Sequence, residues 1–464
     1  MRLGPLLGPD IKEIIKENPS SLRTLLDELE LHPEDLADIV AELDQEDAAK
    51  LLSQVLPADE AAPIFERLDE NEQQELAVAM PTESVARIAS EMEPDDRADL
   101  FSLLPPALGD QVFEKLEKVD AEAAEEVREI EKYPETAAGH LMTTKFVSVP
   151  EHTTVRDALR AVKAFVHENA ESPVYNVYVM GSTEKLIGLI SLRELVAAEE
   201  TDNLDDVART NIITVPPLMD QEEVARYMAK YDLAVIPVVD DKGMLHGVIT
   251  IDDIVDVLTQ EGTEDVQKIG AVEPLDVPYF QTSFVSFIKK RAGWLVILFF
   301  EEFFTQTALR HYEPIMNAVA SAFLYVPLLI SAGGNSGSQS STLIIRGLAI
   351  GEIKLHDWWR ILFRELAMGI TLGLIIAVIA IGRVLMYPDQ TLLFAMTVGV
   401  TVFFIIIAGC TVGSMLPLVL KRLGIDPATS STPFIASLVD TIGVIIYAHV
   451  AKVIMADVIA HAPH

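Results

Sequence analysis

The sequence predicts a multidomain membrane protein, with an α-superhelical amino-terminal domain, a tandem α/β module and a five-helix transmembrane domain. Three observations support this prediction: a sharp division of charge along the chain, two kinds of internal repeat, and long apolar segments in the last part. The protein has 464 residues and a formal net charge of −36. Residues 287–464 contain 10 acidic and 12 basic residues, so the whole negative excess lies in the first part.

The acidic first part argues against several functions. Nucleic acids and anionic membrane surfaces are bound through basic patches, so we expect no nucleic-acid partner. Two interpretations of the charge remain open: it keeps the protein soluble, or bound cations relieve its self-repulsion. The single cysteine, Cys410, excludes an intrachain disulfide, and the first residues do not have the pattern of a secretory signal peptide.

Residues 1–134 are predicted to form an acidic domain of short stacked helices. Helical units begin about every twelve residues, a short period that is typical of superhelical arrays. Their starts lie near Asp35, Asp47, Glu60, Glu72, Ser84 and Asp96. Asp95 and Asp99 share one helix face, where they could bind one cation. A solvated acidic face is the alternative.

Residues 135–258 contain a second repeat, and each copy has the order strand, helix, strand, strand, helix. FVSVPEHTTVRDALRAV with YNVYVMGSTEKLIGLISLRELV corresponds to IITVPPLMDQEEVARYM with LAVIPVVDDKGMLHGVITIDDIVDVL. This arrangement resembles a tandem pair of CBS domains. Such pairs often bind adenine nucleotides between the copies, so ATP or another adenine nucleotide is a candidate ligand.

Residues 259–287 are predicted to connect this module to the membrane through an acidic helix and a linker. The helix begins within the second repeat, and Lys268 is the only base near its carboxylates. Those carboxylates are Asp252, Asp253, Asp256, Glu261, Glu264 and Asp265.

Residues 288–464 are predicted to be the transmembrane domain of a multi-pass protein of the cell (inner) membrane. About 20 apolar residues suffice to cross the lipid bilayer. Five spans are expected, at residues 293–309, 315–329, 361–381, 392–418 and 433–455. Nine Lys and Arg residues lie on one side of these spans and three on the other. This asymmetry predicts a cytoplasmic amino terminus and a carboxyl terminus outside.

Asp440 is the most informative residue of these spans because it interrupts the apolar run 433–455. A charged side chain at such depth normally faces a bundle interior or a water-filled path. A hydrogen bond to a neighbouring helix is the alternative. The glycine-rich segment around Asn335 could line a pore or form a close helix crossing, so Asn335 is a candidate pore residue.

Glu301 and Glu302 lie midway along the first span, with two phenylalanines on each side. Adjacent residues point about 100° apart on a helix, so one narrow path can hardly receive both side chains. One of them could be protonated, or could pair with Arg310 or with a neighbouring helix.

The order of these parts resembles the MgtE family of magnesium transporters over nearly the whole chain. The strongest matches are YVPLLISAGGNSGSQSSTLIIRGLA, RLGIDPATSSTPFIASLVDTIG and TIDDIVDVLTQEGTEDVQKIGAVE. The resemblance implies a homodimeric Mg2+ channel or transporter with its pore at the dimer axis. Asp440 and the carbonyl of Ala436 match the family's positions for holding hydrated Mg2+.

The resemblance also implies that the acidic domains sense intracellular Mg2+ and close the pore when it is high. The residues that match the family's Mg2+-binding acids are Asp95, Asp99, Asp220, Glu222, Asp232, Asp253, Asp256, Glu261, Glu264, Asp265 and Asp426. Two features depart from the family pattern. Thr432 stands where some members carry Asn, and Glu301 with Glu302 lies in a span expected to be mostly apolar.

Other functions remain as alternatives. The ion could be another divalent cation such as Co2+, Mn2+ or Zn2+, although transition metals normally recruit His or Cys. An anion path conflicts with Asp440. A membrane-anchored Mg2+ or nucleotide sensor that transports nothing would not need five spans. Enzymatic activity is not expected, because the sequence contains no Walker loop, nucleophile elbow or metal-ligating His pair.

Overall fold

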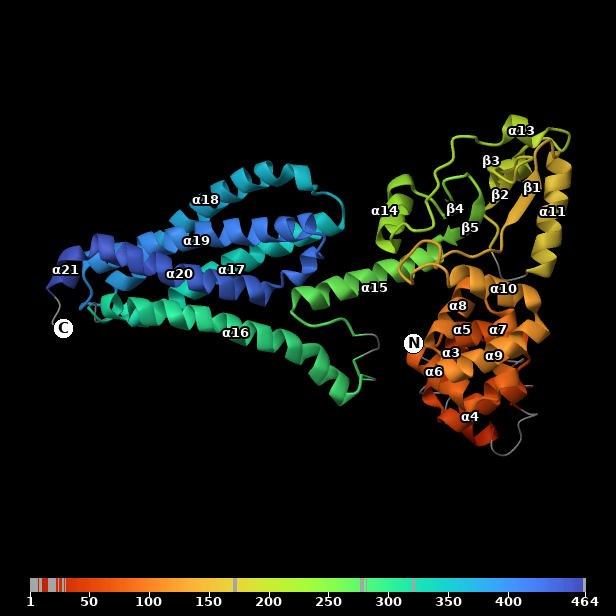
Figure 1. The fold of residues 1–464 in the computed structure, drawn as a ribbon, viewed down its shortest axis with the longest axis horizontal. Coiled ribbons are helices and arrows are strands. Elements are labelled where there is room, and N and C mark those ends of the chain that lie inside the picture. Colours follow the sequence, from red (N-terminus) through yellow and green to blue (C-terminus); the bar gives the residue numbers. More distant parts are fainter. Residues whose placement is uncertain are drawn as a thin grey trace. The chain divides into compact units, whose positions relative to one another are not determined.

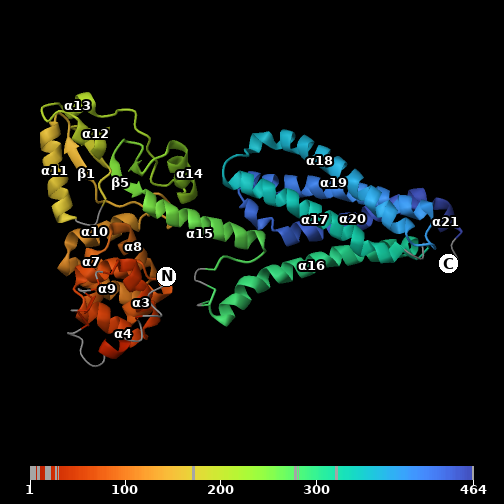
Figure 2. The same ribbon diagram turned by 180° about the vertical axis from the view of Figure 1, so that it is seen from behind.

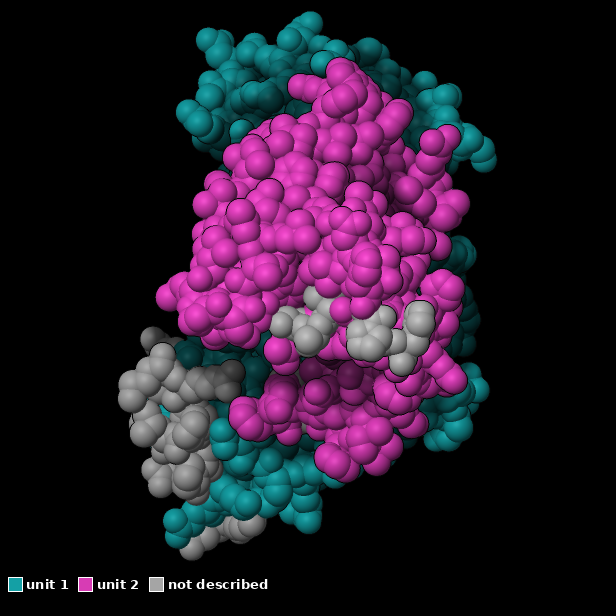
Figure 3. All heavy atoms as spheres, turned by 90° about the vertical axis from the view of Figure 1, so that its left-hand side faces the viewer, with its two compact units in different colours: residues 1–259 teal, residues 260–464 magenta. Residues whose placement is uncertain are grey.

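The computed structural model of the chain describes residues 7, 11–15, 22–23, 25–26, 29, 31–169, 173–275, 279–280, 282–318 and 322–461. These residues form two compact units, Met1–Thr259 and Gln260–His464, which are coloured separately in Figure 3. The predicted second span includes residues 319–321, which lie outside the described residues.

The first part of the first unit is a stack of short helices around one apolar core (Figure 1). Helices two apart in the chain pack on each other, α3 on α5, α5 on α7 and α7 on α9, as in a superhelical array. This arrangement confirms the predicted helical repeat. The elements are α3 (Pro33–Glu42), α4 (Gln45–Lys50), η1 (Leu51–Val55), α5 (Ala58–Glu66), α6 (Glu70–Ala79), α7 (Thr82–Glu91), α8 (Pro94–Leu103), α9 (Pro106–Val119) and α10 (Ala121–Ile130).

The first strand–helix repeat follows in the same unit. β1 pairs with β2 in parallel and β2 pairs with β3 antiparallel, and their alternate residues fill a core beneath α11. The elements are β1 (Val147–Pro150), α11 (Val155–Glu168), β2 (Asn176–Met180), β3 (Leu186–Ser191), α12 (Leu192–Ala197) and α13 (Leu204–Val207).

The second repeat has the same order but lacks a full first strand among its described residues. Val215 makes only an isolated parallel bridge to Val238. Pro216 and Pro217 follow Val215 and have no backbone N–H to extend the ladder. The elements are α14 (Gln221–Tyr231), β4 (Val235–Val239), β5 (Leu245–Thr250) and α15 (Ile251–Ile269), and α15 continues past Thr259 into the second unit.

Long helices form the second unit: α16 (Phe284–Asn317), α17 (Ala322–Ala349), α18 (Trp358–Leu385), α19 (Leu392–Arg422), α20 (Thr432–Ile454) and the short α21 (Ala456–Ala460). The turns η2 (Leu355–Asp357) and η3 (Pro427–Thr429) precede α18 and α20. Helix α19 packs against α17, α18 and α20, and α16 lies along α20 (Figures 1 and 2).

Four segments of the described chain are long and apolar enough to cross a membrane: α16, the segment Leu355–Leu385, α19 and α20. Helix α17, which contains most of the predicted second span, is not among them, because Gly, Ser and Asn lower the hydropathy of its second half. The transmembrane helices are therefore confirmed, whereas their exact number stays a prediction.

The glycine-rich segment does not interrupt α17 but lets it cross α19 closely. A Cβ atom built on Gly413 would lie 2.1 Å from the carbonyl oxygen of Gly337. One built on Gly409 would lie 2.6 Å from the carbonyl oxygen of Gly333. Small residues at such crossings let two backbones approach each other in a membrane, so these four glycines are packing positions.

We predict that Gly413→Ala destabilises the second unit, because the added methyl group meets backbone that cannot rotate away. Overpacking of this kind typically costs about 1–3 kcal/mol. Gly382→Ala is the matched control, since a Cβ atom there meets nothing within 4 Å. Thermal unfolding of the purified protein in detergent measures both. Equal melting temperatures for the two variants would contradict the close crossing.

Candidate functional site

An acidic cavity of about 930 Å³ lies within the first unit, between the helical stack and the strand–helix repeats. Arg67 and Lys145 are the only Arg or Lys among its lining residues in the described chain. Its carboxylates include Glu66, Glu93, Asp95, Asp96, Asp252, Asp253 and Asp256. The predicted residues Asp95, Asp253 and Asp256 therefore meet at one cavity.

Two helix starts carry most of these acids to the cavity. Pro94 opens α8, so Asp95 and Asp96 occupy its first turn, where a carboxylate is favoured by the helix dipole. Asp252 and Asp253 occupy the first turn of α15 in the same way. Local helix chemistry thus accounts for each pair, although it does not account for the meeting of the two pairs.

Burial and mutual repulsion make these carboxylates difficult to ionise. Asp95 has an enclosed Oδ1 atom without a hydrogen-bond partner in the described chain. Burial, and then the charges of Asp96 and Asp253, raise the pKa of Asp95 well above its usual value. Burial also raises the pKa of Asp253 to about 6, although the Thr250 hydroxyl donates to its Oδ2 atom at 2.8 Å.

Glu66 adds a further carboxylate from α5. Its Oε1 atom accepts the backbone N–H of Glu93 at 2.8 Å. Burial raises the pKa of Glu66 to about 7 despite this hydrogen bond. The Glu93 side chain lies 3.7 Å from the ammonium of Lys145.

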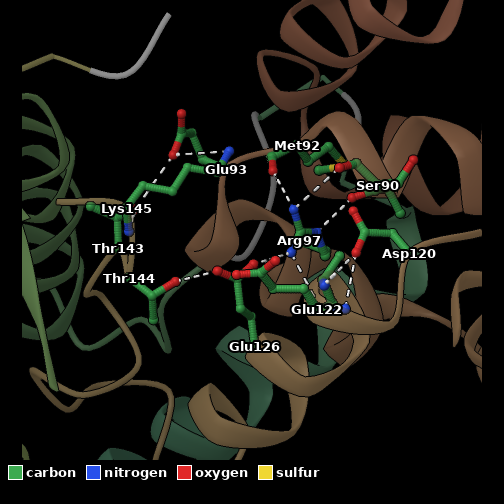
Figure 4. A network of polar contacts seen from close by, with 12 residues as sticks. Ser90, Met92, Glu93, Arg97, Asp120, Glu122, Glu126, Thr143, Thr144 and Lys145 are labelled. Atoms are coloured by element: carbon green, nitrogen blue, oxygen red, sulfur yellow. Dashed lines mark hydrogen bonds and ion pairs between the residues drawn. The ribbon is translucent and has the colours of Figure 1, made fainter. Parts of the chain in front are cut away.

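A buried arginine holds α8 in place (Figure 4). Arg97 is 1% exposed and donates to the carbonyls of Ala89 at 2.6 Å and Met92 at 2.7 Å. It also pairs with Glu126 at 2.7 Å, and Glu126 accepts the hydroxyl of Thr144 at 2.6 Å. The network ties the helix that carries Asp95 to the segment that leads into β1.

The cavity suits a hydrated hard cation. Among the described residues, no three His, Cys, Asp or Glu side chains gather closely enough to enclose a bare metal ion. Mg2+ keeps several of its waters and is commonly bound through only one or two carboxylates. The enclosed, unpaired Oδ1 atom of Asp95 fits such an ion or one of its waters.

The structure places four of the other predicted acids outside the cavity lining. Asp99 lies on α8, but its Oδ1 atom is 2.8 Å from Nε2 of His140, and this contact raises the pKa of His140. Asp220 caps α14 by accepting the backbone N–H of Glu222 at 3.0 Å. Glu222 pairs with Arg226 at 2.5 Å, and Asp232 ends α14 with a positive φ of 52°.

A second acidic group lies in the second unit, where a lysine neutralises part of it. The Lys268 ammonium is 2.6 Å from Glu264 and 2.9 Å from Asp426. Burial lowers the pKa of Lys268, but the hydrogen bonds to these two carboxylates outweigh that effect and raise it. Glu261 and Asp265 lie on the same helix and are half-buried.

Asp440 and Ala436 lie together against α17. A Cβ atom on Gly334 would be 3.5 Å from Oδ1 of Asp440 and 3.3 Å from Cβ of Ala436. Asn335, the next residue of α17, is exposed in the single chain. No basic side chain forms an ion pair with Asp440 in the part of the chain that the structure describes.

Glu301 and Glu302, the adjacent acids of α16, have different surroundings. Glu302 accepts the hydroxyl of Ser437 at 3.1 Å, so it contacts a neighbouring helix. Glu301 has an enclosed Oε2 atom without a hydrogen-bond partner in the described chain. The proposed pairing with Arg310 is absent from the described contacts, since neither glutamate forms an ion pair with it.

Glu66, Glu93, Asp96 and Asp252 are among the cavity acids that were not singled out from the sequence as binding residues. Asp96 and Asp252 stand beside predicted residues, so doubled acids at helix starts were an available signal. Glu66 and Glu93 meet through tertiary contact across 27 positions, for which a single sequence carries no local signal.

Family models match three parts of the chain. Residues 326–450 match MgtE, a divalent cation transporter; residues 31–136 match the MgtE intracellular N domain; and residues 138–200 and 204–260 match CBS domains. The magnesium transporter MgtE of Thermus thermophilus is 37% identical over 454 residues, which cover 97% of this chain and 98% of that relative. The magnesium transporter MgtE of Bacillus subtilis is 32% identical over 430 residues, covering 92% and 93%.

Two solved structures are similar to the soluble part. The cytosolic domain of the Mg2+ channel MgtE in complex with ATP matches with a TM-score of 0.50 and 34% identity, covering 54% of this chain and 100% of that one. The soluble part of a magnesium transporter matches with a TM-score of 0.50 and 30% identity, covering 55% and 98%.

The raised pKa of Glu66 predicts a pH-dependent stability of the soluble part, residues 1–268. The folded state binds the Glu66 proton more tightly than the unfolded chain does. Stability should therefore fall as pH rises from 4.5, the ordinary value, to about 7. The loss for Glu66 alone is on the order of 3 kcal/mol. Chemical unfolding with a chelator present measures it.

Glu66→Gln should flatten this slope, and millimolar Mg2+ should restore stability above pH 7 more than Na+ at matched ionic strength does. Carboxylates with lowered pKa values, such as Asp240, change the stability only below this pH window. A parent stability that is unchanged or that rises between pH 4.5 and pH 7 would refute the assignment.

Proposed function

This chain belongs to the MgtE family of magnesium transporters, and we propose that it is a Mg2+-selective channel that closes when cytoplasmic Mg2+ is high. The observation that carries the proposal is Asp440, a carboxylate at membrane depth that has no basic partner among the described residues. Such a residue normally faces a bundle interior or a water-filled path and marks an ion pathway.

The pore of this proposal is formed by Asp440, the carbonyl of Ala436 and Asn335. A hydrated ion needs few direct ligands, since Mg2+ gives up its waters reluctantly. Two copies of the chain, with α17 as one of five spans, would supply two carboxylates at a shared axis. The amino terminus is then cytoplasmic and the carboxyl terminus outside, as the Lys and Arg distribution favours.

Closure is proposed to come from Mg2+ bound by the acids of the soluble part, with domain boundaries as predicted at residues 134, 258 and 287. The cavity carboxylates repel one another when no cation is present, and a bound divalent ion would favour the compact state. A ligand shifts such an equilibrium only by its differential affinity for the two states. One weak site supplies too little of this difference, so several sites are proposed to act together. They comprise Asp95, Asp99, Asp253 and Asp256, the acids of α14, and the acids of α15 with Asp426.

ATP is the proposed nucleotide of the CBS module. The support is the similar cytosolic domain that was solved in complex with ATP. The nucleotide would add a second regulatory ligand.

We predict that Asp440→Ala abolishes Mg2+ flux, because the pore loses its central fixed charge. Flux into vesicles that contain the purified protein measures this. Asp457→Ala, on the exposed helix α21, is the control and should conduct like the parent. Parent-level flux through folded Asp440→Ala protein would exclude Asp440 from the pore.

We predict that Asp253→Asn raises the Mg2+ concentration needed for half-closure by about fivefold, within the usual range for coupling between sites. The change removes one charge from the cavity and keeps the side-chain volume. Asp110→Asn removes the same charge from an exposed position of α9 and should change nothing. Single-channel recording at a series of cytoplasmic Mg2+ concentrations measures the half-closure concentration. Identical closure curves for both variants would place the sensor elsewhere.

A further inference from the structure

Helix α16 contacts α20 through polar as well as apolar side chains. All its residues except Thr305 and Met316 are exposed or half-buried. The Thr305 hydroxyl lies 2.7 Å from that of Thr441, and Glu302 accepts the Ser437 hydroxyl at 3.1 Å. These two contacts, one turn apart on each helix, form a polar seam.

The seam flanks Asp440 on both sides along α20. Ser437 precedes Asp440 by three positions and therefore shares a face with it, and Thr441 follows it directly. Ser437 is 7% exposed, so its hydroxyl is fixed by packing and holds the Glu302 carboxylate in one place. Its contact with Ser437 places the Glu302 carboxylate about one helical turn from Asp440 along α20, where the two charges repel each other.

Glu302 has a hydroxyl partner in Ser437 but no cationic partner among the described residues. Its neighbours Phe299, Phe300, Phe303 and Phe304 are exposed apolar rings, as expected of a helix that faces lipid. A carboxylate in hydrocarbon costs several kcal/mol, and a single hydroxyl hydrogen bond does not cancel its charge. Glu302 therefore needs the same water-filled path as Asp440.

We propose that Glu302 is a specificity-determining residue of the ion path, held by Ser437 as a second fixed negative charge beside Asp440. A doubly charged ion gains twice the Coulomb energy of a singly charged ion from each added carboxylate. Glu302 thus favours divalent over monovalent cations. The inference rests on the proposed function, because it assumes that Asp440 lines the path.

The permeability ratio of Mg2+ to K+, measured from reversal potentials of the full chain in planar bilayers, tests this role. Glu302→Gln keeps an acceptor for Ser437 and removes the charge, and it should lower the ratio about tenfold. Ser437→Ala keeps the charge but releases it, and it should lower the ratio less. Glu313→Gln, an exposed position on the same helix, should match the parent.

A ratio for Glu302→Gln equal to that for Glu313→Gln would overturn the inference. If Glu302→Gln protein does not fold, Ser437→Ala decides in its place, and an unchanged ratio there overturns the inference as well. Parent protein without Mg2+ current, or Asp440→Ala that conducts like the parent, would instead refute the proposed function and with it this role. A silent Asp440→Ala together with an unchanged Glu302→Gln refutes the role of Glu302 alone.

Discussion

Repulsion between carboxylates that lack basic partners is the interaction on which the candidate sites of both units depend. In the first unit, burial of Asp95 and Asp253 at one cavity opposes their ionisation. In the second unit, Glu302 contacts Ser437, one helical turn from Asp440, and neither carboxylate has a base among the described contacts. The apolar cores hold these groups together against their own charge, and a bound cation would relieve the repulsion at either site.

Two cations that the chain does place near its acids have different chemical roles. Arg97 is always charged, is fully enclosed, and uses its fork of donors on backbone carbonyls and Glu126. It positions α8 without neutralising the cavity. Lys268 is a mobile point charge, partly exposed, that bridges Glu264 and Asp426. A divalent ion can compete with an ammonium of that kind, whereas it cannot displace Arg97.

The elements with a local signal were predictable from the sequence, and the contacts between them were not. Helical periodicity and acids at helix starts predicted the stack, and the internal repeat predicted the strands, except that the second copy has no full first strand among its described residues. Asp440 was predictable because one charge in an apolar run is a local contrast. The meeting of Glu66 with Glu93, and of Asp99 with His140, depends on packing between distant segments. Neither contact leaves a periodic or local signal in one sequence.

Helix α15 carries residues of both acidic groups. Its first turn carries Asp253 into the acidic cavity, and its last turn carries Lys268 toward Asp426, in the loop before α20. Asp253 and Lys268 thus lie on one helix, although the acids around them belong to different units. The attraction between a carboxylate and an ion is proportional to the charge of the ion. A divalent cation is therefore bound more strongly than a monovalent one at each of the two acidic groups.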